Sequence, residues 1–153
     1  MEAEERYAVI YHTELQWYYF LKMKGLTDKV NFWTSRKNTL KLQSGMPFFF
    51  KLSTQRIAGY GIFIEQKQQT IEEAWEDYGI RNGVGDIDDF LARTNRTLHK
   101  ISPEKTIRIT SLVLENIVFF KEPPDINKFG ISPFQVVRYI NSYTANSIIK
   151  SCK

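Results

Sequence analysis

Cysteine and histidine are nearly missing from this sequence. Its one cysteine, Cys152, stands close to the C-terminus, and its two histidines are His12 and His99. One cysteine cannot form a disulfide within the chain, and so few His and Cys side chains exclude the usual zinc sites. The clustered acids at 72–77 and 86–89 are adequately explained as helix starts, where carboxylates are stabilising. We therefore expect no metal and no cofactor.

Long hydrophobic runs are absent as well. No stretch of about 20 apolar residues, the length needed to cross a bilayer, occurs anywhere in the chain. The first six residues, MEAEER, are acidic and polar, which is the opposite of a secretory signal. We therefore expect a cytoplasmic protein without a membrane partner.

The familiar catalytic motifs are also missing. There is no G-x-S-x-G elbow, no P-loop and no H-E-x-x-H pair. The glycines between Gly79 and Gly85 do not lead from a strand into a helix, so they indicate a turn and not a dinucleotide site. These absences predict a protein that is not an enzyme. An enzyme acting on RNA or a nucleotide, with His12 or His99 as its base, remains an alternative.

Aromatic residues and unevenly placed positive charge are what the sequence does have. The 153 residues include eleven Phe, eight Tyr and three Trp, and the length suits one domain spanning 1–153. Residues 22–64 carry eight basic residues and one acid, Asp28, whereas the chain as a whole has a net charge of +4. A basic segment of this kind suits an anionic partner such as nucleic acid, although it is equally typical of a solvated surface.

The order of expected elements is that of an α+β protein. Strands are expected over 7–11, 46–53, 57–65 and 107–120, and helices over 14–24, 71–78 and 87–98. Thr13 is the expected N-cap of the first helix, and Thr70 with Glu73 forms a capping-box sequence. Residues 132–140 carry both helix-start and strand signals, so both remain open. Glycines within a strand, Gly59 and Gly61, favour a curved, closed or nearly closed β-barrel flanked by short helices.

The segment 31–64 carries the strongest binding signal. Trp33 is followed by Thr34, Ser35, Arg36 and Asn38, which combine a stacking surface with hydrogen-bonding groups. Lys51 interrupts an apolar strand and must either extend to solvent or meet an anion. An equally good interpretation places Trp33 in the core and Lys51 at the rim of a barrel. We expect five polar or basic residues of this segment to contact a nucleic-acid backbone: Arg36, Lys37, Asn38, Lys41 and Arg56.

Five stretches in series resemble a known family. They are VNFW at 30–33, GMPFFFKL at 45–52, IAGYGIF at 57–63, EAWEDYGIRNG at 73–83 and LVLENIVFF at 112–120. In this order they are similar to the N-terminal domain of predicted bacterial HNH restriction endonucleases, which belongs with the PUA, EVE, ASCH and YTH domains. The resemblance covers about residues 5–122. It implies a PUA-like curved barrel with an aromatic pocket for a flipped, modified base.

Carried onto this sequence, the resemblance implies a base pocket formed by Trp33, Thr34, Ser35, Phe50, Lys51 and Trp75. It also implies that the protein recognises a modified base, more readily in DNA than in RNA, as part of a restriction or defence system. The implied protein partner is a nuclease. No HNH motif is present, and the segment after Phe120 lacks the family's tryptophan. Nuclease activity is therefore not expected. A sensor that binds a nucleotide-like molecule or a protein partner is the alternative.

Overall fold

The computed structural model describes residues 6–35, 40–98, 107–132 and 135–152. This part of the chain contains six strands and four α-helices in an α+β order, with two short 3-10 helices. Their bounds are β1 Ala8–His12, α2 Leu15–Lys24, β2 Lys29–Thr34, β3 Pro47–Lys51, β4 Ile57–Thr70, α3 Ile71–Tyr78, η1 Gly79–Asn82, α4 Ile87–Leu98, β5 Arg108–Phe119, η2 Ile126–Phe129, β6 Val137–Ile140 and α5 Ser142–Ser151.

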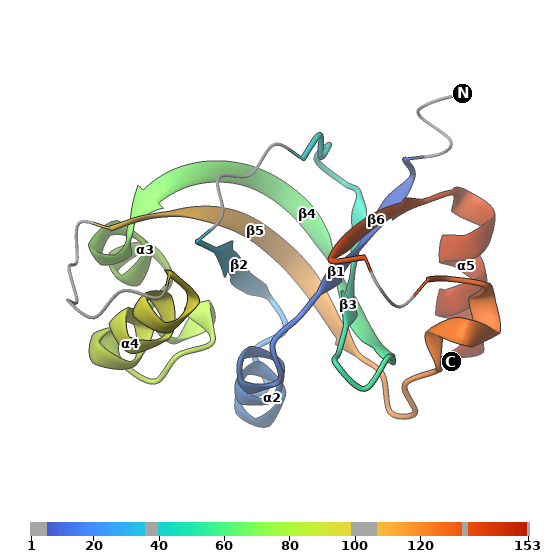
Figure 1. Ribbon diagram of the computed structural model, residues 1–153, viewed down its shortest axis with the longest axis horizontal. Helices are drawn as coiled ribbons and strands as arrows, with labels where there is room; N and C mark the ends of the chain where they lie inside the picture. Colours follow the sequence, from blue (N-terminus) through green and yellow to red (C-terminus); the bar gives the residue numbers. More distant parts are fainter. Residues whose placement is uncertain (1–5, 36–39, 99–106, 133–134, 153) are drawn as a thin grey trace.

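The six strands form a single curved sheet in the order β2-β5-β4-β3-β1-β6. β1 and β3 are parallel, and every other neighbouring pair is antiparallel. The sheet bends into an arch whose back is formed by the long strands β4 and β5 (Figure 1). Within the described residues the edge strands β2 and β6 do not pair with each other, so the sheet is open. The curved sheet with flanking helices is as predicted, but the nearly closed barrel is not confirmed.

Side chains separate the two sides of the arch. The ring of Tyr11, from β1, lies 4.9 Å from the ring of Phe32, from β2, measured between centroids. Hydrogen-bonded strands are only about 4.8 Å apart, whereas surfaces that pack through their side chains are about 10 Å apart. Helix α2 lies beneath the arch and places Trp17 and Leu21 in the same core (Figure 1). The aromatic core therefore fills the space beneath the arch, between strands that are not neighbours in the sheet.

A close backbone contact at Gly59 accompanies the curvature of β4 and β5. Two irregularities interrupt the pairing of these strands. A Cβ atom on Gly59 would lie 2.1 Å from the carbonyl oxygen of Val118. The strand therefore needs a glycine because a neighbouring backbone, not a ligand, occupies this space. On β5, Asn116 has a φ of 53°, in the left-handed region that non-glycine residues rarely adopt.

Local hydrogen bonds define the starts of α3 and α4. Glu73 N donates to Thr70 Oγ1 at 3.1 Å, and Thr70 N donates to Glu73 Oε1 at 2.8 Å, so the predicted capping box is confirmed. At α4, Asp89 N donates to Asp86 Oδ1 at 2.8 Å. These two helices lie together at one end of the sheet, and α5 lies at the other end (Figure 1).

The predicted start of α2 is wrong by one residue. Glu14, not Thr13, is the N-cap, and its side chain makes no capping hydrogen bond. Thr13 is still part of the sheet, because its backbone N donates to Lys51 O at 2.8 Å and extends the β1–β3 pairing. Its hydroxyl donates to Tyr11 O at 2.9 Å. The helix ends at Gly25 as predicted, in the left-handed conformation with φ of 66°.

The C-terminal region resolves an open question of the sequence. Residues 137–140 form a strand, β6, which pairs antiparallel with β1. Asn141 then caps α5 by accepting a hydrogen bond from Thr144 N at 2.9 Å. Ala145 and Ile148 of α5 pack on the outer face of the sheet in a core cluster separate from the one under the arch. No helix in the described part of the chain is long and apolar enough to span a bilayer.

Candidate functional site

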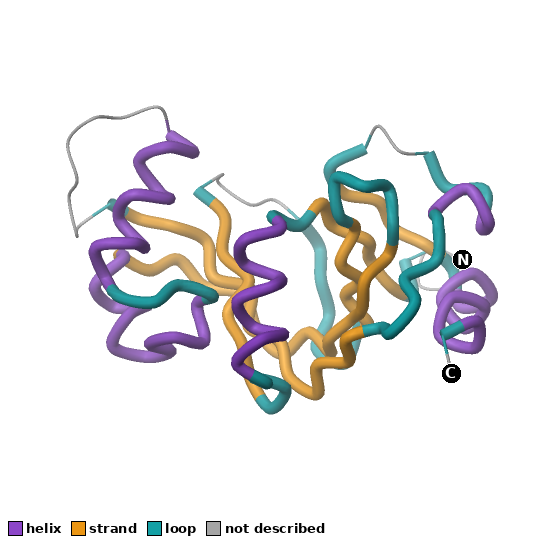
Figure 2. The backbone as a smooth tube through the Cα atoms, turned by 90° about the horizontal axis from the view of Figure 1, so that it is seen from below, coloured by secondary structure: helices purple, strands orange, loops and turns teal. Residues whose placement is uncertain are grey.

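A cavity of about 190 Å³ lies where the arch is open. Its walls come from the end of β1, the start of α2, the end of β2, one residue of α4 and one residue before β6. Figure 2 shows α2 between the α3–α4 end of the molecule and the strands on its other side. The lining residues are Tyr11, His12, Glu14, Trp17, Phe32, Trp33, Thr34, Ser35, Arg93 and Val136. β1 and β2 are not neighbours in the sheet, so the cavity lies between two strands that are not hydrogen-bonded to each other.

Aromatic rings form the inner wall of this cavity. Tyr11 and Phe32 both line it and contact each other, and Phe32 also packs edge-on against Trp17 with centroids 5.1 Å apart. Trp17 Nε1 donates to Asn31 O at 3.1 Å, which fixes this indole against β2. Rings that are already packed against one another lose little further freedom when a flat ligand binds beside them. The wall is therefore suited to contact with a planar group.

Trp33 lines the cavity from the other face of β2. Its Nε1 donates to Asn82 O at 2.9 Å, and its ring lies 4.9 Å from that of Phe90 on α4. These contacts come from η1 and α4, outside the core beneath the arch. The indole is half-buried and its orientation is set by a hydrogen bond as well as by packing. The side chain is therefore held in one orientation where it lines the cavity.

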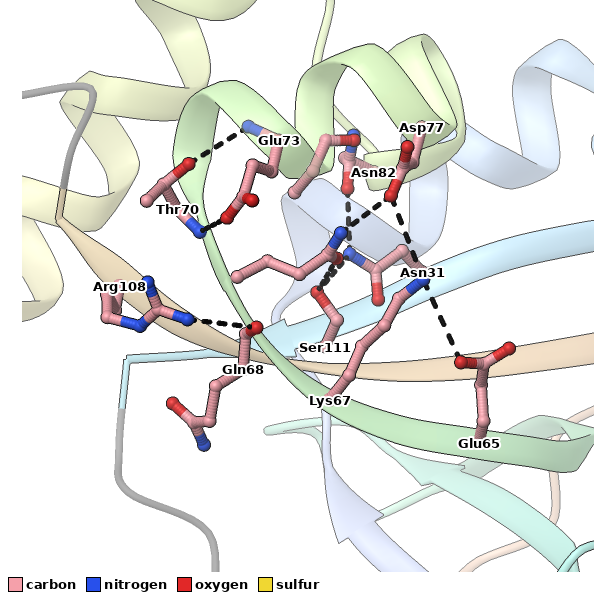
Figure 3. A network of polar contacts seen from close by, with 12 residues as sticks. Asn31, Glu65, Lys67, Gln68, Thr70, Glu73, Asp77, Asn82, Arg108 and Ser111 are labelled. Atoms are coloured by element: carbon pink, nitrogen blue, oxygen red, sulfur yellow. Dashed lines mark hydrogen bonds and ion pairs between the residues drawn. The ribbon is translucent and has the colours of Figure 1, made fainter.

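A buried polar network supports this position of Trp33 (Figure 3). Asn31 Nδ2 donates to Asn82 Oδ1 at 2.8 Å and to Ser111 Oγ at 3.0 Å. Ser111 Oγ in turn donates to Gln69 Oε1 at 2.8 Å, and Gln69 Nε2 donates to Asp77 Oδ2 at 2.6 Å. The network thus joins β2, β5 and β4 to α3 and η1. Buried polar groups that are paired in this way define one arrangement of the elements that carry them. Asp77 is the exposed end of the network, and the Oδ1 atom of Asn31 is buried without a hydrogen-bond partner among the described residues.

His12 and Lys51 occupy paired positions beside the cavity. They face each other in the register of β1 and β3, but only His12 lines the cavity. Lys51 is 5% exposed, and its Nζ donates to Gln135 O at 2.6 Å. Burial lowers the pKa of Lys51. Burial, together with the nearby Lys51 charge, also lowers the pKa of His12, while the Glu14 carboxylate acts in the opposite direction.

A neutral imidazole at His12 predicts a pH effect on stability. Because its pKa is lower in the folded protein, the unfolded chain takes up the proton first as the pH falls below about 6.5. The free energy of unfolding should therefore fall between pH 7.5 and 5.5, and fall less in His12→Gln. Urea unfolding at the two pH values measures this. His99 is present in both proteins and cancels, so equal losses in both would contradict the assignment.

Arg93 brings a paired cation to the cavity wall. Its Nη1 donates to Gly83 O at 2.9 Å, and its Nη2 forms an ion pair with Asp89 Oδ2 at 3.0 Å. Asp89 lies one helical turn before it on α4, so the charge is partly neutralised where it lies. Glu14, at the start of α2, brings a carboxylate to the same cavity. The cavity therefore has polar groups of both signs and no excess of positive charge.

The structure brings together three of the six predicted pocket residues. Trp33, Thr34 and Ser35 line the cavity, and Lys51 lies behind His12 without lining it. Phe50 does not line it either, since it is fully buried with its ring 5.3 Å from that of Trp17. Trp75 is half-buried against the core of α3 and α4, away from the cavity lining.

The five predicted backbone-contact residues are only partly described. Arg36, Lys37 and Asn38 lie outside the described residues. Lys41 is exposed, and its backbone N donates to the hydroxyl of Tyr139 at 3.0 Å. Arg56 is exposed in the turn between β3 and β4, and its Nη1 donates to Pro123 O at 2.9 Å. Their contact with nucleic acid remains a prediction.

Seven residues of the lining were not predicted as pocket residues: Tyr11, His12, Glu14, Trp17, Phe32, Arg93 and Val136. Of these, His12 was named only as the base of the alternative enzyme. His12 and Glu14 could have been predicted, because polar residues directly after a buried strand often lie at the edge of a sheet where ligands bind. Arg93 and Val136 gave no signal, because their place depends on the packing of segments far apart in the sequence. Among the described side chains, no group of three His, Cys, Asp or Glu residues is placed to bind a metal.

Comparisons with known proteins identify the fold. No protein-family model and no curated protein sequence matches the chain. Its structure is similar to the ASCH protein of Zymomonas mobilis, with a TM-score of 0.65, 13% identity, and coverage of 97% of this chain and 98% of that one. A tyrosine-to-phenylalanine mutant of that protein gives 0.67 and 12%, covering 97% and 100%. The N-terminal domain of Staphylothermus marinus McrB gives 0.62 and 10%, covering 95% and 94%. The chain therefore shares the fold of these domains.

Proposed function

We propose that the chain, residues 1–153, acts as one non-catalytic nucleic-acid-binding module whose cavity accepts a single unstacked base. The observation that carries this proposal is the cavity between β1 and β2, with its aromatic inner wall and its mixed polar groups. A volume of about 190 Å³ is below the range of about 300–1,000 Å³ typical of pockets for drug-sized molecules. It suits one base, with the sugar and phosphate outside.

Aromatic contact supplies the attraction that a base loses on leaving its stack. Stacking on an aromatic side chain contributes about 1–3 kcal/mol per base. The flanking phosphates would meet the basic surface of residues 22–64, on which the predicted contact residues Lys41 and Arg56 are exposed. Phosphate contacts of this kind add affinity that decreases with salt. Affinity would thus come from the surface and selectivity from the cavity.

The finer part of the proposal concerns the partner. The resemblance of the sequence to domains of HNH restriction endonucleases supports a modified base in DNA as the ligand, within a restriction or defence system. It also supports a nuclease subunit or domain as the protein partner. The fold shared with the McrB N-terminal domain agrees with this proposal.

Filling the cavity tests the proposal directly. Val136 lines the cavity and is 39% exposed, so Val136→Trp adds a large ring there without removing a buried side chain. We expect this variant to bind duplex DNA carrying a modified base about 10- to 100-fold more weakly, since the stacking contribution is lost. Val118→Trp is the matched control, because Val118 is 41% exposed on β5 and does not line the cavity. Fluorescence anisotropy at two salt concentrations measures both.

Two results would overturn the proposal. One is that Val136→Trp binds with the same affinity as the original protein, and that Ser35→Trp, which fills the cavity from the opposite wall, does so too. The other is failure of the folded protein to bind any oligonucleotide at low salt.

A second candidate function is a sensor for a free nucleotide. The same cavity volume favours it, because a base that is not part of a polymer would fit equally well. Calorimetric titration with nucleoside monophosphates distinguishes the two functions. Micromolar binding of a monophosphate, together with no gain in affinity from the flanking nucleotides of an oligonucleotide, would favour the sensor.

A further inference from the structure

We propose that the outer edge of β6 binds an extended acidic segment of a partner protein, which adds a strand to the sheet beside a second cavity. This surface shares no lining residue with the cavity between β1 and β2, so the inference goes beyond the proposed function and does not depend on it. β6 lies at the end of the sheet that carries α5, away from α3 and α4 (Figure 1). Among the described residues it pairs only with β1, so it is an edge strand.

The pairing of β6 with β1 shows which backbone groups of this edge are free. His12 N donates to Val136 O at 2.7 Å, and in an antiparallel pair every second residue bonds to the neighbouring strand in this way. By the register, Arg138 belongs to the bonded set, whereas the N–H and C=O groups of Val137 and Tyr139 point away from β1. In the described part of the chain no hydrogen bond reaches these four groups. A row of free backbone donors and acceptors is a template for another strand.

A cavity of about 230 Å³ lies along this edge. Three consecutive residues of β6, 138–140, line it, although successive side chains of a strand point to opposite faces. The cavity therefore follows the edge of the strand and not one face of the sheet. Its other lining residues come from η2, from the segment after η2 and from the start of α5: Phe129, Ile131, Asn141 and Thr144. When a peptide adds to a sheet edge, main-chain hydrogen bonds supply affinity and a neighbouring pocket receives a side chain, so both parts of such a site are present.

The charges around this edge fit an acidic peptide. Arg138 lines the cavity, and none of the lining residues is acidic. The exposed guanidinium of Arg6 lies 5.2 Å from the centre of the Tyr139 ring, which also lines the cavity. The exposed Lys128 Nζ lies 5.9 Å from the centre of the Phe129 ring, another part of the lining. None of these three cations forms an ion pair with an acid among the described side chains, so their charge is available to a ligand.

Two other occupants fit this edge less well. A nucleic-acid phosphate offers only acceptor oxygens, so it would leave the outward carbonyl groups of Val137 and Tyr139 without a partner. A second copy that pairs antiparallel through the same four groups would place the Arg138 side chains of the two copies directly opposite each other. Like charges at opposite positions of paired strands are destabilising. An acidic strand satisfies both the backbone groups and the charge.

Peptide binding to the full chain tests the inference. The probe is a fluorescent, end-blocked decapeptide of alternating threonine and glutamate. One control peptide has lysine in place of glutamate, and the other is the acidic peptide with its central amides N-methylated, so that it cannot donate to a strand edge. We expect the acidic peptide to bind about tenfold or more tightly than either control in fluorescence anisotropy, since each lost hydrogen bond to the edge weakens binding several-fold. It should also slow amide exchange at Val137 and Tyr139, measured by NMR.

Two variants separate the charge from the backbone contact. Arg138→Glu should weaken binding of the acidic peptide about tenfold, because attraction becomes repulsion. Its matched control is Lys150→Glu, which changes the net charge equally at an exposed position of α5 outside the lining and should change binding by less than about twofold. Val137→Pro removes one outward N–H without removing a bond to β1, and should weaken binding about fivefold. Thermal melts of the variants verify folding.

Several outcomes would overturn the inference. Equal affinity for the acidic and lysine peptides, or unchanged exchange at Val137 and Tyr139 in the presence of the acidic peptide, would do so. A dimer of the original protein that is lost in Val137→Pro, measured by analytical ultracentrifugation, would assign the edge to a second copy. Displacement of the bound peptide by a duplex oligonucleotide would assign it to nucleic acid.

Discussion

Replacing Gly59 with alanine is expected to lower the free energy of unfolding by about 3 kcal/mol or more, at the upper end for overpacked sites. The new Cβ would lie 2.1 Å from the carbonyl oxygen of Val118, and this neighbour is backbone that no rotamer change can move. β4 and β5 would have to separate locally and weaken the bond from Phe120 N to Ala58 O, now 2.9 Å. Chemical denaturation measures the change.

Gly85→Ala is the matched control for this substitution. Its added Cβ would meet nothing closer than Phe20 Cε2 at 4.0 Å. Alanine there is expected to leave stability unchanged or raise it by up to about 1 kcal/mol, since it restricts the unfolded chain. If both variants unfold at the same denaturant concentration, β4 and β5 do not approach as closely at Gly59 as the structure indicates.

Asn82→Ala is expected to have the second large effect, a loss of about 3 kcal/mol in the free energy of unfolding, because buried groups left unpaired cost about 1–3 kcal/mol each. Asn82 Nδ2 donates to Ala74 O at 3.0 Å and to Gly79 O at 2.9 Å, while Oδ1 accepts from Asn31. The backbone oxygen of Asn82 holds the Trp33 indole. The variant should therefore also change the near-ultraviolet circular dichroism of the folded protein.

Asn127→Ala tests whether this effect belongs to the network. Asn127 is exposed in η2, and its replacement should change stability by no more than about 0.5 kcal/mol. Equal stability of Asn82→Ala and Asn127→Ala would show that the hydrogen bonds of the buried Asn82 amide contribute nothing measurable to stability. Loss of stability without a change in the tryptophan signal would show that Trp33 is oriented by Phe90 alone.

Local chemistry explains which parts of the fold the sequence predicted. The capping box of Thr70 and Glu73 involves four consecutive residues, and Gly25 ends α2 through its own backbone conformation. Gly59 signals a close approach by its lack of a side chain. In each case the cause lies within a few residues of the signal, so no knowledge of distant packing is needed.

Phe50 shows why the pocket was predicted only in part. β3 lies between β4 and β1, and all five of its residues, including the run of Phe48, Phe49 and Phe50, are buried. A strand covered on both faces has no alternation of apolar and polar residues, so the face on which each ring lies cannot be read from the sequence. The sequence could not predict that the sheet is open either, because this depends on whether the two edge strands, β2 and β6, pair with each other.

The wide spacing of the cavity walls along the chain has a consequence for biosynthesis. Tyr11 and Val136 face the same space, and β2, whose end supplies a third wall, pairs with β5 about eighty positions later. A nascent chain emerging from the ribosome can form α2 early, yet the cavity is incomplete until nearly all of these segments have been made. Any ligand of the cavity can therefore bind only after synthesis of these segments is almost finished.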